Sequence, residues 1–351
     1  MALLSVQNIS IKGIAACVPK QKEYTSNYSL FTEEEKELFI KSVGITERRV
    51  APFEITTSDM CYHAAEKLIA DLQWSKEDIG CLIFVSQSTD YLLPATSIIL
   101  QHRLQLSNTT MAFDVGLGCS GYVYGLQLMA SLLTSGQIKK GILLVGDKST
   151  LSTHFEDKST YPLFGDAGCA TAMEYDISAA PIYFNSQSDG AGEDAIKILD
   201  GAARNTVRDD TFEIVEVEPG VKRSRRHLAL KGIDIFNFAL KEVTPNIHEL
   251  LKFATIEKEQ VNYFVFHQAN RLINESVRKK LKVLDVSKVP YSIQLFGNTS
   301  SASIPLTMVT QLKQKLQDEN TLLLSGFGVG YSWSSCVFNS KSIYCSDLIE
   351  I

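Results

Sequence analysis

The chain has 351 residues, enough for two domains or for one large pseudo-symmetric unit. Hydrophobic residues make up 45% of it, charged residues 21% and aromatic residues 9%, which is typical of a globular protein and excludes a disordered or collagen-like chain. The 34 lysines and arginines and the 40 aspartates and glutamates leave a net charge of −6, which argues against a general nucleic-acid binder.

The apolar runs and the cysteines bear on where the protein works. The N-terminus lacks a basic leader region, and no apolar run is long enough to span a membrane. The 7 cysteines are scattered without a CxxC pair, which predicts a reduced, cytoplasmic setting without membrane contact. The 6 histidines show no HExxH or HxH pairing, so we expect no metal ion.

Short apolar runs alternate with longer amphipathic stretches, which predicts an α/β fold with buried strands. The predicted elements are, in chain order, a helix over 58–74, strands over 81–87 and 110–116, a helix over 121–136, a strand over 141–147, a helix over 233–254, a strand over 261–268, a helix over 303–317 and a strand over 321–327. Between residues 186 and 231 the polar composition indicates a long surface excursion. No nucleotide-phosphate motif is present in the sequence.

The two halves of the chain repeat one plan of strands and helices. Cys119 precedes Leu143 by 24 residues, and Asn298 precedes Leu322 by 24 residues. In this plan the segment YSIQLFG, before Asn298, is a strand equivalent to the strand over 110–116. We therefore predict a duplicated α/β unit, with residues 1–175 carrying Cys119 and residues 176–351 carrying the second set of polar site residues.

Cys119 is the strongest candidate for a reactive residue. It lies in GLGCSGYVYGL, between a predicted strand and a predicted helix, and glycines on both sides let the backbone turn and a substrate approach. A thiol at the start of a helix meets the positive end of the helix dipole and free backbone amides, which lower its pKa. This context predicts a nucleophile, whereas a cysteine at an arbitrary position is more often a small core residue.

His267 and Asn298 are the polar candidates of the second half. Each follows a predicted strand, and ligands bind at the carboxyl ends of strands in such folds, so we expect both to converge with Cys119 on one crevice. Taken alone, the histidine would be a structural residue and the asparagine a cap or turn residue. The glycine-rich GFGVGYSW (326–333) can turn its amides inward and complete an oxyanion hole beside the Cys119 amide, or it can be a plain β-turn.

The basic run KRSRR offers a candidate docking surface. Lys222, Arg223, Arg225 and Arg226 can contact the phosphates of coenzyme A or an acidic carrier protein. The alternative is a solvated charged face without a ligand.

Together these blocks resemble the β-ketoacyl-acyl-carrier-protein synthase III family of thiolase-like condensing enzymes. The resemblance runs over essentially the whole chain, from IKGIAACVP through VGITERRVAP, AFDVGLGCSGYVYGL, LFGDAG, VFHQAN and FGNTSSASIP to GFGVGYSW. It implies an internally duplicated, five-layered αβαβα fold and a homodimer.

The resemblance also implies roles for the candidate residues. Cys119 would take an acyl group from a coenzyme A or acyl-carrier-protein thioester, with the backbone amides of Cys119 and Val329 as the oxyanion hole. His267 and Asn298 would bind the thioester carbonyl of a malonyl extender and stabilise the enolate left by carbon dioxide. The product would be a 3-oxoacyl thioester of fatty acid, related lipid or polyketide biosynthesis, made without a cofactor beyond the thioester substrates.

Four positions depart from the pattern of the family. Leu38 and Ser42 stand where a tryptophan and an arginine commonly contact the coenzyme A adenine, which favours a carrier-protein donor. Arg271, associated with carrier docking, stands one place early, and Leu272 takes its usual position. Leu93 replaces a bulky aromatic residue that closes the acyl pocket across the dimer in short-chain enzymes, which leaves the length of the primer open.

Other functions of a similar chain remain as alternatives. A related acyltransferase passes the cysteine-bound acyl group to a hydroxyl or amine without decarboxylation, but such enzymes tend to alter the residue at Asn298. A silent partner subunit of a condensing enzyme usually lacks the cysteine that this chain keeps at position 119. A degradative thiolase needs a second cysteine in the final glycine loop, and a cysteine peptidase has different surroundings.

Overall fold

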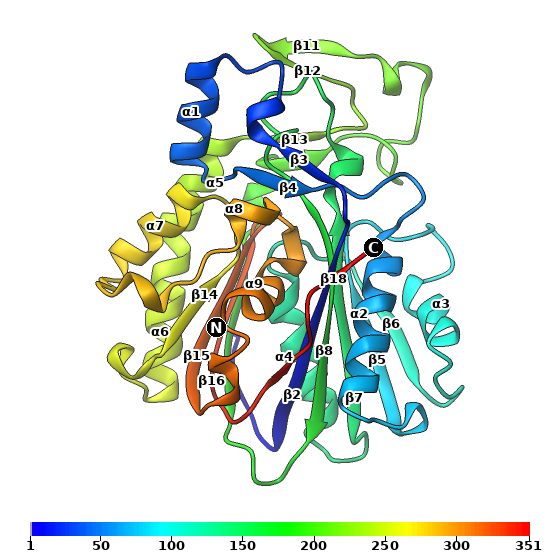
Figure 1. Ribbon diagram of the computed structural model, residues 1–351, viewed down its shortest axis with the longest axis vertical. Coiled ribbons are helices and arrows are strands. Elements are labelled where there is room, and N and C mark those ends of the chain that lie inside the picture. The colour runs from blue at the N-terminus through cyan, green and yellow to red at the C-terminus, as the bar shows by residue number, and fades with distance from the viewer. Residues whose placement is uncertain (1) are drawn as a thin grey trace.

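The computed structural model describes residues 2–351. Two β-sheets and three layers of helices alternate in it, so the predicted five-layered αβαβα arrangement is confirmed (Figure 1). Two large hydrophobic clusters and two smaller ones fill the spaces between the layers. Burial of these apolar faces is the main force that holds the layers together.

The first sheet has seven strands, in the order β17-β2-β8-β7-β5-β6, with β18 also paired to β2. Their bounds are Ile9–Val18 for β2, Ile79–Val85 for β5, Met111–Val115 for β6, Lys140–Lys148 for β7, Asp166–Tyr175 for β8, Tyr344–Cys345 for β17 and Ile349–Glu350 for β18. Helices α2 (Thr57–Asp71) and α3 (Thr96–Arg103) cover its outer face. Because both faces of the sheet are covered, β5 is apolar along its whole length and β7 is apolar between its charged ends.

The second sheet has five strands, in the order β1-β9-β16-β15-β14. Their bounds are Ala2–Val6 for β1, Ile182–Ser188 for β9, Tyr263–Phe266 for β14, Asn320–Gly328 for β15 and Ser332–Ser340 for β16. Helices α5 (Gly232–Phe238), α6 (Thr244–Ala254) and α7 (Arg271–Lys280) lie on its outer side. The predicted helix over 233–254 is thus two α-helices joined by a π-helical segment, Ala239–Val243.

The central layer consists of α4 (Gly121–Leu133) and α9 (Ser303–Gln311). Helix α4 contacts β5, β7 and β8 of the first sheet and β15 and β16 of the second, and α9 contacts β2, β8 and β14 (Figure 1). Helices that touch a sheet on each side are apolar nearly all round, as both sequences are. Each of these buried helices begins a few residues after a predicted site residue.

The prediction of a strand over YSIQLFG is wrong. Ile293–Phe296 form a short helix, α8, so within the described chain the second sheet has no counterpart of β6. After α8, Gly297 has a φ of +68°, which turns the chain toward the first half, and Asn298 forms an isolated parallel bridge with Phe164. The backbone of this segment therefore pairs outside its own sheet.

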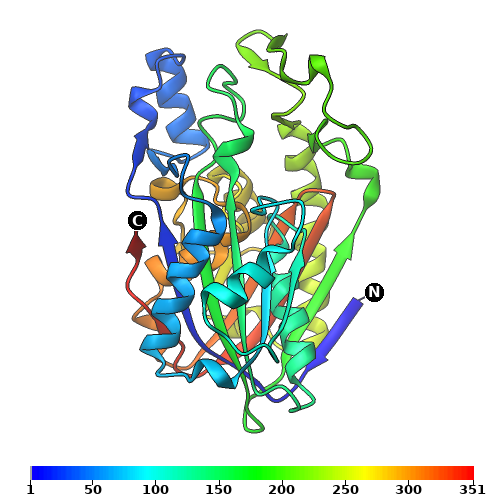
Figure 2. The same ribbon diagram turned by 90° about the vertical axis from the view of Figure 1, so that its right-hand side faces the viewer.

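The remaining elements gather at one end of the molecule. They are α1 (Glu33–Ser42), β3 (Lys22–Tyr24), β4 (Glu47–Arg49), β10 (Ile196–Ile198), β11 (Val215–Glu218), β12 (Val221–Arg223) and β13 (Leu228–Leu230). Figure 2 shows α1 and the β11–β12 hairpin at this end on opposite sides of the molecule. The predicted surface excursion therefore contains two short β-ribbons, β10–β13 and β11–β12.

Each end of the chain adds strands to the sheet of the other half. Strand β1 belongs to the second sheet, where it pairs with β9, whereas β17 and β18 belong to the first sheet, where they pair with β2. The predicted division after residue 175 falls at the end of β8, before β9 begins. Each sheet is therefore completed by a strand from the far end of the chain.

Candidate active site

A single cavity of about 880 Å³, counting its open mouth, brings the predicted site residues together. Cys119, His267, Asn298 and Val329 all line it. These residues come from four separate segments of the two halves, so only the packing of the layers places them side by side. A cavity with a few convergent polar groups in an otherwise apolar lining is the usual form of a small-molecule site.

Cys119 lies immediately before the first turn of α4, with Ser120 as the N-cap residue of that helix. Strand β15 of the second half passes directly beside it. A Cβ atom built on Gly328 would lie 2.6 Å from the Cβ and 3.0 Å from the Sγ of Cys119, closer than atoms can pack. The approach of β15 to the sulfur therefore requires glycine at position 328.

The expectation of a lowered pKa for Cys119 is wrong. Burial of the thiol, and then the negative charge of Asp147, raise its pKa from 9.0 to about 11. Hydrogen bonds from the Ser300 side chain and from the backbone amides of Val329 and Cys119 oppose the rise but do not cancel it. Desolvation of a buried thiolate outweighs the helix N-terminus here, so the residue is a thiol at neutral pH.

His267 directly follows β14, as the sequence predicts, and its side chain is buried. Its Nδ1 atom lies 2.7 Å from the hydroxyl of Ser303, the first residue of α9. Burial lowers the pKa of the imidazole from 6.5 to about 3, so the ring is neutral at pH 7. When Ser303 donates to Nδ1, the proton of the neutral ring is on Nε2, which is then a hydrogen-bond donor.

The side-chain amide of Asn298 is held so that its Nδ2 group remains available as a hydrogen-bond donor. Its Oδ1 accepts a hydrogen bond of 2.9 Å from the Ser300 amide, whereas its Nδ2 makes only a long 3.4 Å contact with the carbonyl of Ala269. Its backbone amide donates to Leu163, and its carbonyl accepts from Gly165. The side chain therefore presents a neutral donor, and its backbone is fixed by residues of the first half.

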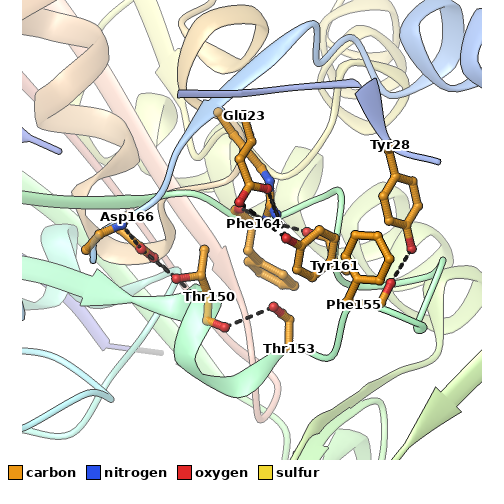
Figure 3. A network of polar contacts seen from close by, with 10 residues as sticks. Glu23, Tyr28, Thr150, Thr153, Phe155, Tyr161, Phe164 and Asp166 are labelled. Carbon is orange, nitrogen blue, oxygen red and sulfur yellow. Dashed lines mark hydrogen bonds and ion pairs between the residues drawn. The ribbon is translucent and has the colours of Figure 1, made fainter. Parts of the chain in front are cut away.

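The segment 149–164 forms one side of the cavity and is held by a polar network (Figure 3). The buried carboxylate of Asp166 accepts from the amide and the hydroxyl of Thr150 at 3.0 and 2.6 Å, and Thr153 donates to the Thr150 carbonyl at 3.0 Å. Further along the segment, the Tyr28 hydroxyl donates to the Phe155 carbonyl at 2.6 Å. These bonds fix the backbone that presents Leu163 and Phe164 to the cavity.

The predicted surface excursion contributes to the site. Its β10–β13 ribbon and the residues after it provide a large share of the apolar cavity lining: Ile196, Ile198, Leu228, Leu230 and Ile235. Sequence reasoning missed this role because the excursion is polar on average, whereas only a few alternating residues of two short strands face inward. The ribbon gives the cavity an apolar surface beside the polar catalytic groups.

Leu93 and Arg271 lie outside the cavity lining. Leu93 is 86% exposed, so in a single chain it contacts no acyl pocket. Arg271 begins α7 and packs against Gly44 at the end of α1, while its neighbour Asn270 faces the cavity. Their predicted roles therefore depend on a second molecule.

The basic run is largely occupied by internal ion pairs. Lys222 lies 3.1 Å from Glu156, and Arg223 lies 3.1 Å from Asp157. Arg225 binds the buried Asp200 at 2.8 Å, and Arg226 makes a 3.5 Å contact with the carbonyl of the same residue. Much of the positive charge that suggested anion binding is thus offset within the chain.

Sequence reasoning also missed polar residues beside the nucleophile. Asp147, Ser300 and Gln87 line the same cavity as Cys119. Asp147 stands at the end of a predicted strand, which is the signal used for His267, and that signal should have identified it. Ser300 and Gln87 carry no comparable signal because serine and glutamine are common in loops. Across residues 2–351, no group of three histidine, cysteine or acidic side chains is arranged to hold a metal ion.

The fold and the cavity define a class of protein. A cysteine at the start of a buried helix, facing a neutral histidine and an asparagine amide in a duplicated αβαβα fold, is the arrangement of a thiolase-like condensing acyltransferase.

Comparison with known proteins agrees with this class. Residues 113–190 match the family model 3-oxoacyl-[acyl-carrier-protein] synthase III, and residues 251–340 match its C-terminal counterpart. The β-ketoacyl-[acyl-carrier-protein] synthase III of Aliarcobacter butzleri is 32% identical over 339 residues, covering 95% of this chain and 98% of that protein. The crystal structure of a 3-oxoacyl-(acyl-carrier protein) synthase from Burkholderia xenovorans superposes with a TM-score of 0.93 at 36% identity, covering 99% of each chain. The chain belongs to the β-ketoacyl-acyl-carrier-protein synthase III family.

Proposed function

We propose that the enzyme condenses an acyl thioester with malonyl-acyl-carrier protein, with loss of carbon dioxide, to give a 3-oxoacyl-acyl-carrier protein in fatty acid, related lipid or polyketide biosynthesis. The observation that carries the proposal is the convergence of Cys119, His267 and Asn298 on one cavity. Coenzyme A or carrier-protein thioesters are the substrates, and no further cofactor enters the reaction.

In the first half-reaction, the sulfur of Cys119 attacks the carbonyl carbon of the acyl thioester. The amides of Cys119 and Val329, which hydrogen-bond to the sulfur in the empty site, are close enough to stabilise the oxyanion of the tetrahedral intermediate. The carbon–sulfur bond of the donor then breaks, and the leaving thiol carries away the proton of Cys119. The acyl group remains on the enzyme as a thioester.

In the second half-reaction, the thioester oxygen of the malonyl group accepts hydrogen bonds from His267 and Asn298. Breakage of the bond to the carboxylate releases carbon dioxide, and its electron pair forms an enolate held by these two donors. The enolate carbon attacks the acyl carbon, a carbon–carbon bond forms, and the sulfur of Cys119 leaves and recovers a proton. Both donors are neutral, so neither is a strong acid that would protonate the carbanion.

We propose a carrier protein, rather than free coenzyme A, as the acyl donor. Leu38 is 65% exposed on α1, and the Ser42 hydroxyl is already bonded to the Leu38 carbonyl. Neither side chain offers the stacking surface or the charge that would recognise an adenine nucleotide. Arg271, at the start of α7, is an exposed cation next to Asn270, which lines the cavity, and it can contact an acidic carrier.

We propose a homodimer that forms through β6. Among the described strands, β6 is at the edge of the first sheet and pairs only with β5. The loop before α3 is tied to β6 by hydrogen bonds of the Thr96 and Ser97 amides to Asp114, and it carries the exposed apolar residues Tyr91, Leu92 and Leu93. Pairing of two β6 edges would bury this surface and bring Leu93 to the acyl pocket of the partner.

We also propose a cytoplasmic location. All seven cysteines are unpaired and buried, which suits a reducing compartment. No helix within residues 2–351 has the length and apolarity needed to cross a bilayer.

The proposed function is tested by the intact mass of the protein after incubation with acyl-coenzyme A and acyl-carrier-protein thioesters of graded chain length. Wild type should gain one acyl group, faster from the carrier protein, and Cys119→Ala should gain none. Addition of malonyl-carrier protein should then release carbon dioxide and discharge the adduct. An adduct that discharges to a hydroxyl or amine without carbon dioxide would instead indicate the non-decarboxylating acyltransferase, and no adduct from any donor would indicate a silent subunit.

A further inference from the structure

Asp147 is a buried carboxylate beside the nucleophile that the proposed reaction does not yet use. It is the next-to-last residue of β7, is 2% exposed and lines the cavity. Its Oδ1 accepts from the Gln87 amide at 2.7 Å and the Ser86 hydroxyl at 3.1 Å. Its Oδ2 accepts from the Ser301 hydroxyl at 2.9 Å and the Ser301 amide at 3.3 Å.

This set of partners favours the ionised carboxylate. Each carboxylate oxygen accepts from a backbone N–H group, which can only donate. A proton on either oxygen would therefore point at a second donor and weaken that hydrogen bond. Within the described chain, Asp147 makes no ion pair, and the ammonium group of its neighbour Lys148 is bound to the carbonyls of Pro52 and Ile55 at 2.7 and 2.9 Å. Burial raises the pKa of Asp147, and the hydrogen bonds oppose this rise.

The carboxylate connects the two halves of the site. Gln87 and Ser86 follow β5 of the first half, whereas Ser301 belongs to the turn between Asn298 and α9. In the same turn, Ser300 has a φ of +50°, an unfavourable conformation for a residue with a Cβ atom. Asp147 therefore bonds to a strained turn whose Ser300 amide orients the Asn298 side chain.

Asp147 also sets the charge around the sulfur. The other titratable groups in the cavity lining are Lys148 from β7 and His267 after β14, and from the outer side Cys61 of α2 packs near Asp147. Lys148 is held by backbone carbonyls, His267 is neutral and the Cys61 thiol has a raised pKa. The Ser300 hydroxyl lies 4.0 Å from the sulfur. Of these groups, Asp147 is the one whose charge raises the pKa of Cys119.

We infer that Asp147 is a positioning residue of the proposed condensation, which holds the Asn298 turn against the Cys119 side of the cavity and whose negative charge, facing the same cavity, disfavours the thiolate form of Cys119. The first role serves decarboxylation, because it orients the amide that binds the enolate oxygen. The second role slows the reaction of the sulfur with other electrophiles. The inference rests on the proposed function for the first role only.

The test compares Asp147→Asn with Asp200→Asn. Asp200 is a matched control because it is equally buried and accepts hydrogen bonds from the Thr211 hydroxyl and from Arg225, but it does not line the cavity. The first readout is the rate of alkylation of Cys119 by iodoacetamide without substrate, followed by mass spectrometry of the Cys119 peptide. At pH 8, Asp147→Asn should react about tenfold faster than wild type, because removal of a nearby like charge lowers a pKa by about one unit. Asp200→Asn should react at the wild-type rate.

The second readout separates the two half-reactions. In Asp147→Asn, the loss in carbon dioxide release from the malonyl thioester should be about tenfold larger than the loss in acylation. The reason is that the new amide group opposes the donors of Ser301, so the turn that carries Asn298 is no longer held. Ser301→Ala, which keeps the charge, should show the same selective loss without faster alkylation, and it serves alone if Asp147→Asn does not fold. Unchanged alkylation together with equal losses in both half-reactions would overturn the inference. If wild type neither acylates nor decarboxylates, the proposed function fails, but the alkylation rates still test the charge.

Discussion

The turn that carries Cys119 and the turn that carries Asn298 stand at equivalent places in a duplicated plan, yet they are built differently. Cys119 follows a true strand, β6, whose backbone pairs with β5 of its own sheet. Asn298 follows a short helix, and its backbone pairs with Leu163 and Gly165 of the other half. Both turns precede a helix of the central layer.

This difference shows how one fold supplies two kinds of chemistry. The Cys119 turn needs open backbone amides around the sulfur, and a strand followed by a helix start supplies them. The Asn298 turn needs a side-chain amide held at a fixed orientation, which its bonds to the first half, to Ser300 and through Ser301 to Asp147 supply. The backbone that carries Cys119 therefore pairs within its own half, although β15 of the second half packs against the sulfur, whereas the backbone of the proposed enolate-binding residue pairs with the other half.

The largest effect should come from Gly328→Ala, which disturbs the Cys119 turn alone. The added methyl group would overlap Cys119, so the sulfur must move, and a displacement of about 1 Å is enough for at least a ~100-fold loss of condensation. Gly116→Ala is the control, because a Cβ there meets no atom within 4 Å. Acyl-enzyme formation measured by intact mass checks the prediction, and equal activity of the two variants would contradict the close packing of β15 on the nucleophile.

A smaller effect, confined to one half-reaction, is expected for the Asn298 turn. Asn298→Asp keeps an oxygen acceptor for the Ser300 amide but removes the Nδ2 donor and adds a negative charge near the enolate. Carbon dioxide release should fall by about 100-fold, while acylation changes by only a few fold. Parallel assays of both half-reactions measure this. If acylation fell as much as decarboxylation, Asn298 would act on the first step too and the division between the turns would be wrong.

The buried His267 should make stability depend on pH. Its pKa is about 3 in the folded protein and near 6.5 in an unfolded chain, so the unfolded state binds more protons between these values. The free energy of unfolding should therefore fall as pH drops below 6.5, by about 2 kcal/mol at pH 5. Denaturant unfolding of wild type and His267→Gln at pH 5 and 7 tests this, and an equal pH dependence in both proteins would show that His267 does not titrate as proposed.

The smallest effect concerns the support beneath the Asn298 turn. Arg49 pairs with Glu350 of β18 at 2.6 Å, and its guanidinium lies over the ring of Phe296, two residues before Asn298. Because Glu350 is about half exposed, Glu350→Gln should lower the free energy of unfolding by less than about 1 kcal/mol. Glu319→Gln, which disrupts a fully exposed pair with Lys341, should have no measurable effect. A loss of decarboxylation in Glu350→Gln would show that the C-terminal strand β18 also helps to position Asn298.

The sequence predicted most of what depends on local pattern. Apolar runs identified β5, β6, β7, β14 and β15, and glycine-flanked or strand-end positions identified Cys119 and His267. These signals are readable because a buried strand must be apolar and a turn between strand and helix favours glycine. The helical period likewise identified α2, α4 and α9.

Prediction from the sequence pattern failed where contacts between distant segments override the local structural preference. The YSIQLFG segment has strand-like composition but lacks a neighbouring strand to pair with, so it forms α8. The alternating residues of β10 and β13 line the cavity although the surrounding excursion is polar. The sequence also did not predict that the basic run pairs with acidic residues of other segments, because a count of charges does not show which charges pair.

By itself the sequence determined most of the buried strands and helices and the residue types available for acyl transfer, because these follow from hydrophobic period and local turn chemistry, whereas the layered arrangement was implied by the family resemblance. Only the tertiary structure decided which groups meet. It placed β15 against Cys119, joined Asn298 to the first half and buried Asp147 beside the sulfur. It also reversed the expected pKa of the thiol, because desolvation depends on everything packed around Cys119 and not on the helix that follows it.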